Sequence, residues 1–319
     1  MVTSIQSVAV VGAGYMGGGI AQSFALTGVP VTIADADADA TAAAYERLLH
    51  EAQEFEDAGL YDAGATETIR ERLSAADSIE EAVAGADFIE EAVFESLEVK
   101  HQVLSRISAA ARPDAIIGSN TSTIPATRLA EAVQGPERFL TVHFSNPAPF
   151  IPGVELVLGA NTDRNVVPIV RELLARAGRQ GALVHDTPGF VLNRLQYVLL
   201  KEATSIAEEG IASPEDIDTI VRTTFGYRLG FFGPFAIADQ AGLDVYAGGF
   251  ATFEEAYGER LAPPQLIKDA VAGDRRGVKN GRGLVRDYTP EQVAALVNYR
   301  NKAYSEMGRL LRQIGPAPE

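Results

Sequence analysis

Short apolar runs rich in β-branched residues alternate with segments of helical periodicity over residues 1–185. This alternation is typical of a parallel sheet with helices on both faces. The chain is therefore expected to begin with a doubly wound α/β domain over residues 1–186. The expected strands are Ser7–Val11, Val31–Ala34, Phe88–Glu91, Ile116–Gly118, Phe139–His143 and Leu183–Val184, and the expected helices are Gly17–Thr27, Thr41–Glu56, Leu97–Ala110 and Val166–Ala177.

The pattern changes at Asp186-Thr187-Pro188-Gly189, and no strand pattern follows it. One apolar helix is expected from Phe190 to Ile206, and another helix begins after the capping sequence Ser213-Pro214-Glu215-Asp216. Residues 187–319 are therefore predicted to form a second, all-helical domain. Its first helix is more apolar than a surface helix requires, which predicts a buried hairpin core or a subunit interface.

The segment Gly12-Ala13-Gly14-Tyr15-Met16-Gly17 joins the first expected strand to the first expected helix. In a G-x-G-x-x-G turn, Gly12 makes the tight bend, Gly14 lets the backbone approach a pyrophosphate, and Gly17 lets helix and strand pack closely. The pyrophosphate then binds the free N–H groups of the first helical turn, which Tyr15 and Met16 open. This placement predicts a Rossmann-type dinucleotide site.

Asp35 ends the second apolar run, about 20 residues beyond the glycine turn. A carboxylate at this position accepts hydrogen bonds from an adenosine ribose and repels a 2′-phosphate, which favours NAD over NADP as the cofactor. The alternative is that Asp35 only opens the polar run 35–39 as a helix N-cap.

Composition narrows the partners of this chain of 319 residues, of which 46% are hydrophobic. The net charge of −16 argues against nucleic acid and anionic membranes, because both attract clustered positive charge. The absence of cysteine excludes disulfides and cysteine-ligated metal, and no metal site is expected. Without a signal peptide or an apolar stretch of ~18 residues, the expected location is the cytoplasm.

His143 lies at the end of an expected strand, where a parallel sheet presents its ligand crevice. The run Val154–Leu158 could return as a strand and bring Glu155 beside His143. A carboxylate bound to one imidazole nitrogen fixes the tautomer, and the other nitrogen can then take a proton from a substrate hydroxyl. On spacing alone, a structural histidine with satisfied hydrogen bonds is an equal alternative.

Polar side chains follow the strand Ile116–Gly118 in the run Ser119-Asn120-Thr121-Ser122-Thr123. This run either faces the ligand crevice or only caps the helix after Pro125. Asn193 lies in the first turns of the apolar helix of the second domain. Because a buried amide needs partners, Asn193 either bonds local backbone or faces a ligand.

Five groups of residues together resemble the NAD-dependent 3-hydroxyacyl-CoA dehydrogenase family in order and spacing over nearly the whole chain. The resemblance implies a catalytic dyad of His143 and Glu155, with Ser122 and Asn193 contacting the substrate oxygen. It also implies a dimer formed by the helical domain. It places Glu95 and Lys100 near the nicotinamide ribose, and Asn120 and Asn146 with the cofactor-binding residues. The groups are Gly12–Gly17, Glu91–Glu95 with Lys100, Ser119–Ser122, His143–Pro147 with Glu155, and Gly189–Arg194.

One departure concerns the helical segment after Asp35, where the coenzyme A-binding members usually carry lysines. Here Glu46–Asp57 is acidic, and Arg47 is its only Lys or Arg. The segment Gly189–Ser213 is similar to the lambda-crystallin/L-gulonate 3-dehydrogenase and carnitine dehydrogenase branch, whose members act on small free hydroxy acids. The expected partner is therefore a hydroxy acid or its acyl thioester, and Arg228 and Arg282 are candidates to hold a substrate carboxylate. A dehydrogenase of another small alcohol and a crystallin-like, non-enzymatic protein are the alternatives.

Overall fold

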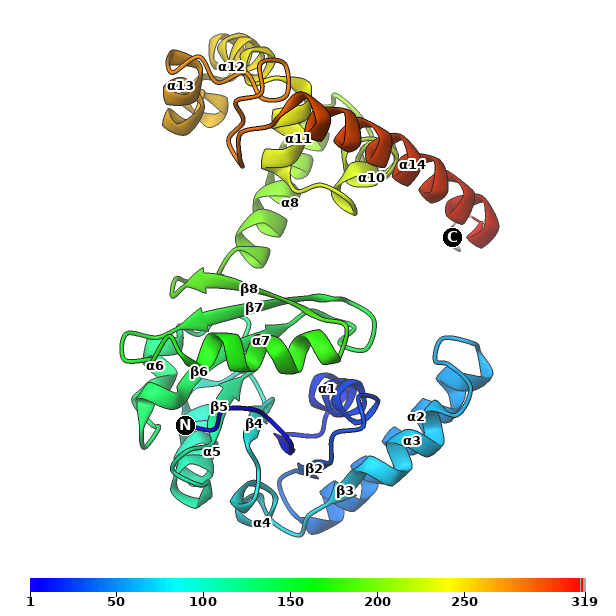
Figure 1. Ribbon diagram of the computed structural model, residues 1–319, viewed down its shortest axis with the longest axis vertical. Helices are drawn as coiled ribbons and strands as arrows, with labels where there is room; N and C mark the ends of the chain where they lie inside the picture. The colour runs from blue at the N-terminus through cyan, green and yellow to red at the C-terminus, as the bar shows by residue number, and fades with distance from the viewer. Residues whose placement is uncertain (316, 318–319) are drawn as a thin grey trace. The chain divides into compact units, whose positions relative to one another are not determined.

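The structure, a computed structural model, describes residues 1–315 and Ala317 (Figure 1). The chain forms two compact units, Met1–Leu199 and Leu200–Glu319, which divide inside helix α8 (Leu192–Glu208). The domain boundary between residues 186 and 187 remains a prediction.

A single eight-stranded sheet forms the centre of the first unit, in the order β3-β2-β1-β4-β5-β6-β7-β8. Neighbouring strands are parallel throughout, except that β6 and β7 are antiparallel. The first six strands in this order have the arrangement of a dinucleotide-binding sheet, which confirms the predicted fold class. The strands are β1 (Val8–Val11), β2 (Val31–Ala34), β3 (Leu73–Ala75), β4 (Phe88–Glu91), β5 (Ile116–Ser119), β6 (Phe139–Phe144), β7 (Gly153–Leu158) and β8 (Gln180–His185).

Apolar side chains alternate between the two faces of this sheet and make a separate core on each. One core contains Phe24, Leu48 and Val170, which α1 (Tyr15–Ala25), α2 (Ala38–Asp57) and α7 (Val166–Arg176) contribute. The opposite core is covered by α4 (Ile79–Ala84), α5 (Leu97–Ala110) and α6 (Ala126–Ala130). Helix α3 (Ala65–Arg72) packs along α2 as a hairpin (Figure 1), and a 3₁₀ turn, η1 (Pro136–Arg138), precedes β6.

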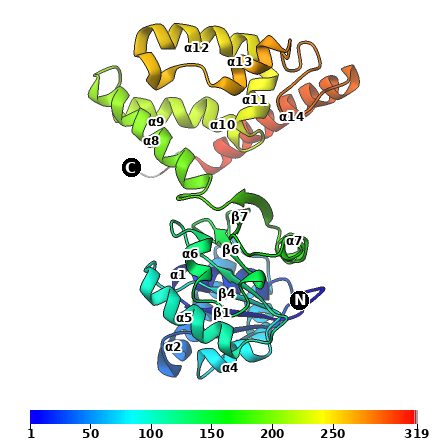
Figure 2. The same ribbon diagram turned by 90° about the vertical axis from the view of Figure 1, so that its left-hand side faces the viewer.

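The second unit is helical, as predicted, and Figure 2 shows its helices in a second orientation. Ser213 caps α9 by accepting a hydrogen bond from the Asp216 N–H at 3.1 Å, and Thr289 forms a capping box at the start of the last helix. A small core surrounds Leu243 and Ile267. The elements after α8 are α9 (Pro214–Thr223), α10 (Phe225–Leu229), α11 (Pro234–Ala241), α12 (Leu243–Tyr257), η2 (Gly258–Leu261), α13 (Gln265–Ala272) and α14 (Pro290–Ile314).

Candidate active site

The three glycines of the turn between β1 and α1 differ in their surroundings. Gly12 has a φ of 92°, and a Cβ atom there would lie 2.8 Å from the backbone of Ala92. A Cβ atom on Gly17 would collide with the carbonyl oxygen of Gly12. A Cβ atom on Gly14, in contrast, would meet no other atom within 4 Å. Gly12 and Gly17 therefore serve the packing of the turn, and Gly14 faces open space.

The residues around this turn fit NAD. No side chain caps α1 among the described residues, so the first-turn N–H groups, including those of Tyr15 and Met16, are left to bind a ligand oxygen. Asp35 follows β2 and binds the turn, because its Oδ2 accepts from the Ala13 N–H at 2.8 Å. The helix N-cap here is Asp37, which accepts from the Ala40 N–H, so the cap alternative for Asp35 is wrong.

His143 and Glu155 lie directly opposite each other on the antiparallel strands β6 and β7. The His143 Nδ1 is 2.8 Å from Glu155 Oε2, and both residues are less than 10% exposed. Burial acts to raise the pKa of Glu155, but the hydrogen bonds from His143 and from two backbone N–H groups hold it below its ordinary value. The carboxylate is thus stable as an anion, and the second imidazole nitrogen is left for other partners.

The two backbone N–H groups on Glu155 belong to Val191 and Leu192, which donate to its Oε1 at 2.9 Å each. The start of α8 is therefore bound to the same carboxylate that holds His143. Gly189 and Phe190 make the turn into the helix with φ values of 73° and 48°. Phe190 is fully buried, and its ring centre is 5.8 Å from that of His143. A bulky residue tolerates a positive φ only where its surroundings impose it.

The polar loop after β5 is organised by Glu95. Its Oε1 accepts hydrogen bonds from the Thr121 hydroxyl at 2.7 Å and from the backbone N–H groups of Ser122 and Thr123. Burial acts to raise the pKa of Glu95, but these donors and nearby Lys100 hold it below its ordinary value.

The alternative that this loop only caps α6 is wrong, because Asp186 binds the first N–H groups of that helix. Asn193 donates to the carbonyl oxygen of Ser122 at 2.9 Å, which links α8 to the loop. Asn120 accepts from the Phe144 N–H at 2.8 Å and so links the ends of β5 and β6.

A fully buried ion pair lies behind the loop. The Lys100 Nζ donates to Glu91 Oε1 at 2.8 Å and lies 3.5 Å from Glu95 Oε2. Glu91 also accepts from the Ser119 hydroxyl at 2.5 Å and from the Val93 N–H at 2.7 Å. Sequence reasoning gave Glu91 no role, although its position at the end of β4 is the edge where ligands bind to such sheets.

These residues surround one cavity of about 630 Å³ within the first unit. Ser122, His143 and Asn193 face it together with Glu95. Lys100 lies behind the wall, and no lysine or arginine lines the cavity within the described part of the chain. Sequence reasoning did not anticipate Ile151 or Gln196. The lining residues are Met16, Ala92, Val93, Glu95, Asn120, Ser122, His143, Phe144, Ser145, Asn146, Ile151, Leu192, Asn193 and Gln196.

The dinucleotide-binding sheet and this cavity define the class of protein as an NAD-dependent dehydrogenase. The chain belongs to the 3-hydroxyacyl-CoA dehydrogenase family. The family's NAD binding domain matches residues 7–187, and its C-terminal domain matches residues 189–287.

Two curated relatives illustrate the range of the family. The 5-formyl-3-hydroxy-2-methylpyridine 4-carboxylate 5-dehydrogenase of Mesorhizobium japonicum is 35% identical, over 96% of this chain and 98% of its own length. The 3-hydroxybutyryl-CoA dehydrogenase of Bradyrhizobium diazoefficiens is 32% identical, over 89% of this chain and 96% of its own. Among solved structures, the 3-hydroxyacyl-CoA dehydrogenase of Archaeoglobus fulgidus is 30% identical, with a TM-score of 0.79 over 97% of this chain and 99% of that one.

Two predicted residues, Arg228 and Arg282, belong to the helical unit. They do not share a site there, because Arg282 lies 4.0 Å from Asp274 and is absent from the cavity that Arg228 lines. Across the described residues, no helix combines the length and apolar character needed to cross a bilayer, and no three His, Cys, Asp or Glu side chains cluster as metal ligands.

Proposed function

We propose that the chain oxidises the secondary alcohol of a 3-hydroxy acid, or of its thioester, to the 3-keto compound, with His143 as general base. The observation that carries this proposal is the buried pair of His143 and Glu155, 2.8 Å apart at the wall of the cavity. Glu155 occupies one imidazole nitrogen, so the Nε2 of His143 takes the hydroxyl proton. NAD, when bound, accepts the hydride from the carbinol carbon.

The charge that develops on the histidine is stabilised by Glu155, whose pKa is held low by its donors. Ser122 and Asn193, which line the same cavity, hold the substrate oxygen. The Ser122 hydroxyl has no hydrogen bond to any described residue, which leaves it free to donate. Donors aimed at a reacting oxygen can each contribute about 3 kcal/mol to the transition state.

The cofactor residues follow from the glycine turn. Gly14 and the first turn of α1 receive the pyrophosphate, and Asp35 binds the adenosine ribose with the lone pairs that the N–H groups of Ala13 and Ala36 do not use. Glu95, Asn120 and Asn146, which all line the cavity, contact the nicotinamide side. Lys100 is completely buried, so it acts as a positioning residue for Glu95.

A second candidate is the oxidation of a small carboxylated ring alcohol or aldehyde on the same scaffold. It is favoured by the relative from Mesorhizobium japonicum, whose name describes a pyridine carboxylate, matched end to end at 35% identity. Neither that substrate nor a free hydroxy acid carries coenzyme A.

The test is NADH formation over a panel of 3-hydroxybutyryl-CoA, free 3-hydroxybutyrate, L-carnitine, L-gulonate and the pyridine carboxylate. With the best substrate, His143→Gln should lower kcat by ~10²- to 10⁴-fold, the range for a positioned general base. The NAD dissociation constant should change little. His101→Gln, which removes an imidazole outside the cavity lining, is the control and should keep kcat. A near-normal kcat for His143→Gln would show that another residue is the general base.

A further inference from the structure

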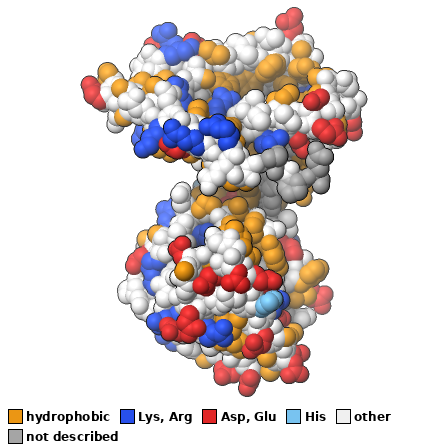
Figure 3. All heavy atoms as spheres, turned by 90° about the vertical axis from the view of Figure 1, so that its right-hand side faces the viewer, with side chains coloured by type: hydrophobic (Ala, Val, Ile, Leu, Met, Phe, Trp, Pro, Cys, Tyr) orange, Lys and Arg blue, Asp and Glu red, His pale blue; other side chains and the backbone are white. Residues whose placement is uncertain are grey.

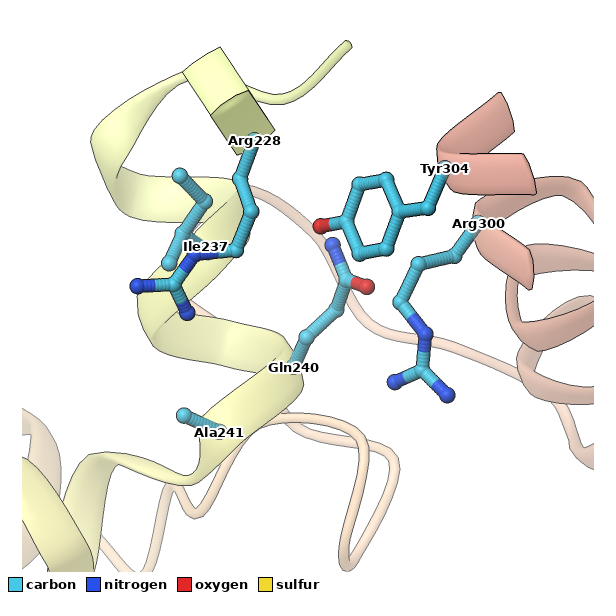
Figure 4. Close-up of a pocket in the computed structure, with 6 residues that line it drawn as sticks. All are labelled: Arg228, Ile237, Gln240, Ala241, Arg300 and Tyr304. Carbon is cyan, nitrogen blue, oxygen red and sulfur yellow. The ribbon is translucent and has the colours of Figure 1, made fainter. Parts of the chain in front are cut away.

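The helical unit contains a cavity of about 200 Å³ that shares no lining residue with the cavity of His143. Figure 4 shows its lining, in which the guanidinium groups of Arg228 and Arg300 lie on opposite sides of the Gln240 amide. Arg228 comes from α10, Gln240 from α11, and Arg300 and Tyr304 from α14. Arg300 and Tyr304 are four residues apart, so they share one face of that helix.

Neither guanidinium has a counter-ion among the described residues. Arg228 makes no side-chain hydrogen bond or ion pair there, and Arg300 only donates to the neutral amide of Asn301 at 3.2 Å. Both arginines are half-buried. Two partly desolvated cations that line one cavity repel each other, so an anion placed between them is stabilised. This pairing stands out in a chain with a net charge of −16.

The remaining wall supplies further polar groups and an apolar surface. The Gln240 Oε1 is buried without a hydrogen-bond partner in the described structure, and the Tyr304 hydroxyl has none either. Ile237 and Ala241 add apolar atoms. A planar guanidinium binds a carboxylate with two parallel hydrogen bonds, which makes arginine pairs suited to this anion. The volume is about that of six or seven water molecules, so the ligand is small.

We propose that this cavity is a binding site for a small carboxylate, held by Arg228 and Arg300 and flanked by Gln240 and Tyr304. The carboxylate forms charge-assisted hydrogen bonds with the two guanidinium groups, and its short carbon chain packs against Ile237. The site is defined by binding, so it stands independently of the catalytic role of His143.

The experiment is calorimetric titration of the full-length protein with succinate and butyrate, with butyramide as the uncharged control. Both acids should bind, and butyramide should not. Arg228→Gln and Arg300→Gln should each weaken binding at least ~10-fold, since each removes hydrogen bonds between charged groups. Arg228→Lys should retain part of the affinity. Arg222→Gln, an exposed arginine on α9, is the matched control and should bind normally.

Equal affinity of the wild type and the two Gln variants, or equal binding of butyramide, would overturn the proposal, as would the absence of binding to a folded wild type. Circular dichroism checks that each variant is folded. Kinetics then identify the source of the carboxylate. If it is the hydroxy-acid substrate, Arg228→Gln raises the KM of the free acid at least ~10-fold. If it is a separate metabolite, that KM is unchanged and succinate still binds at saturating substrate.

Discussion

Two glycines of the same turn should respond differently to the same substitution. Gly14 has a φ of −65° and open space around it, so Gly14→Ala should leave the free energy of unfolding within about 1 kcal/mol of the wild type. Its methyl group would occupy the space of the pyrophosphate, so the KM for NAD should rise ~10-fold or more. Thermal unfolding and steady-state kinetics measure the two effects.

Gly17→Ala is the counterpart, because its methyl group would collide with the Gly12 carbonyl in the folded protein. It should lower the melting temperature clearly, by the equivalent of several kcal/mol. An unchanged KM for NAD in a stable Gly14→Ala protein would show that the pyrophosphate does not bind beside Gly14.

The sequence predicted those residues of the cavity that are marked by the end of a strand or by the spacing of a motif. His143 and Ser122 follow this rule, because His143 lies near the end of β6 and Ser122 lies three residues beyond the end of the neighbouring strand β5. The second role of Glu155, binding the start of α8, could not be read from the sequence. It depends on the positive φ of Phe190, which tertiary packing imposes.

Glu90 on β4 and Glu155 on β7 are both buried, and the two should affect stability with opposite pH dependence. Glu90 on β4 is fully buried without a partner among the described residues, and burial raises its pKa well above 4.5. Its folded form therefore holds a proton that the unfolded chain releases, so its contribution is present at low pH and lost as pH rises. Glu155 has a lowered pKa, so its contribution is present above the ordinary value and lost as pH falls.

Glu90→Gln and Glu155→Gln test these signs, and each serves as the control for the other. Relative to the wild type, Glu90→Gln should gain stability as the pH rises above the ordinary pKa of a glutamate, by up to ~1.4 kcal/mol per pH unit. Glu155→Gln should be most destabilised near pH 7, and this deficit should shrink toward pH 3. Urea unfolding at each pH measures both, and parallel pH profiles of the two variants would contradict the assignment.

The regular elements were predicted best where burial dictates the pattern. The predicted strands match β1, β2, β4, β5 and β6, whose apolar residues are buried in the two cores, and also β8, which is mostly exposed. In the first unit, the missed elements are β3, α3 and α4, each of eight residues or fewer. Helix α4 depends on its Ser78 cap and α3 on Glu56, which accepts from Gly64 and Thr66. Such local hydrogen bonds leave little periodic signal in the sequence.

The exposed apolar face of α8 predicts a homodimer. The described residues of this helix include none that is buried within the chain, and Leu195, Val198 and Leu200 are 57%, 65% and 64% exposed. Figure 3 shows one face of the helical unit, on which hydrophobic side chains gather above a row of Lys and Arg side chains. Apolar area of this extent is normally covered by a partner, and a second copy is the one that the resemblance implies.

Light scattering at micromolar concentration should give twice the mass of the 33.9 kDa chain. Val198→Asp combined with Leu200→Asp should shift the protein toward monomer, because two charges would be buried in the interface. Thr204→Asp, at an exposed polar position of α8, is the control. A monodisperse wild-type monomer would exclude this interface.

At the scale of the whole molecule, the distribution of charge decides whether the substrate is a free acid or its thioester. The acidic segment forms α2, where Glu51 pairs with Arg47, Glu54 with His50, and Glu56 caps α3. No lysine is available there for the phosphates of coenzyme A. A free acid should therefore be used at least as well as its thioester, since like charges weaken the binding of phosphates.

The measurement is kcat/KM for 3-hydroxybutyryl-CoA against the free acids of the panel. Glu54→Lys, at an exposed position of α2, should raise kcat/KM for the thioester and leave the free acids unchanged, and Glu54→Gln should have a smaller effect. A wild-type preference of ~100-fold for the thioester corresponds to about 2.7 kcal/mol of extra transition-state binding. Binding of that size needs cations that α2 does not provide. Such a preference would therefore mean that another surface of the chain binds the phosphates.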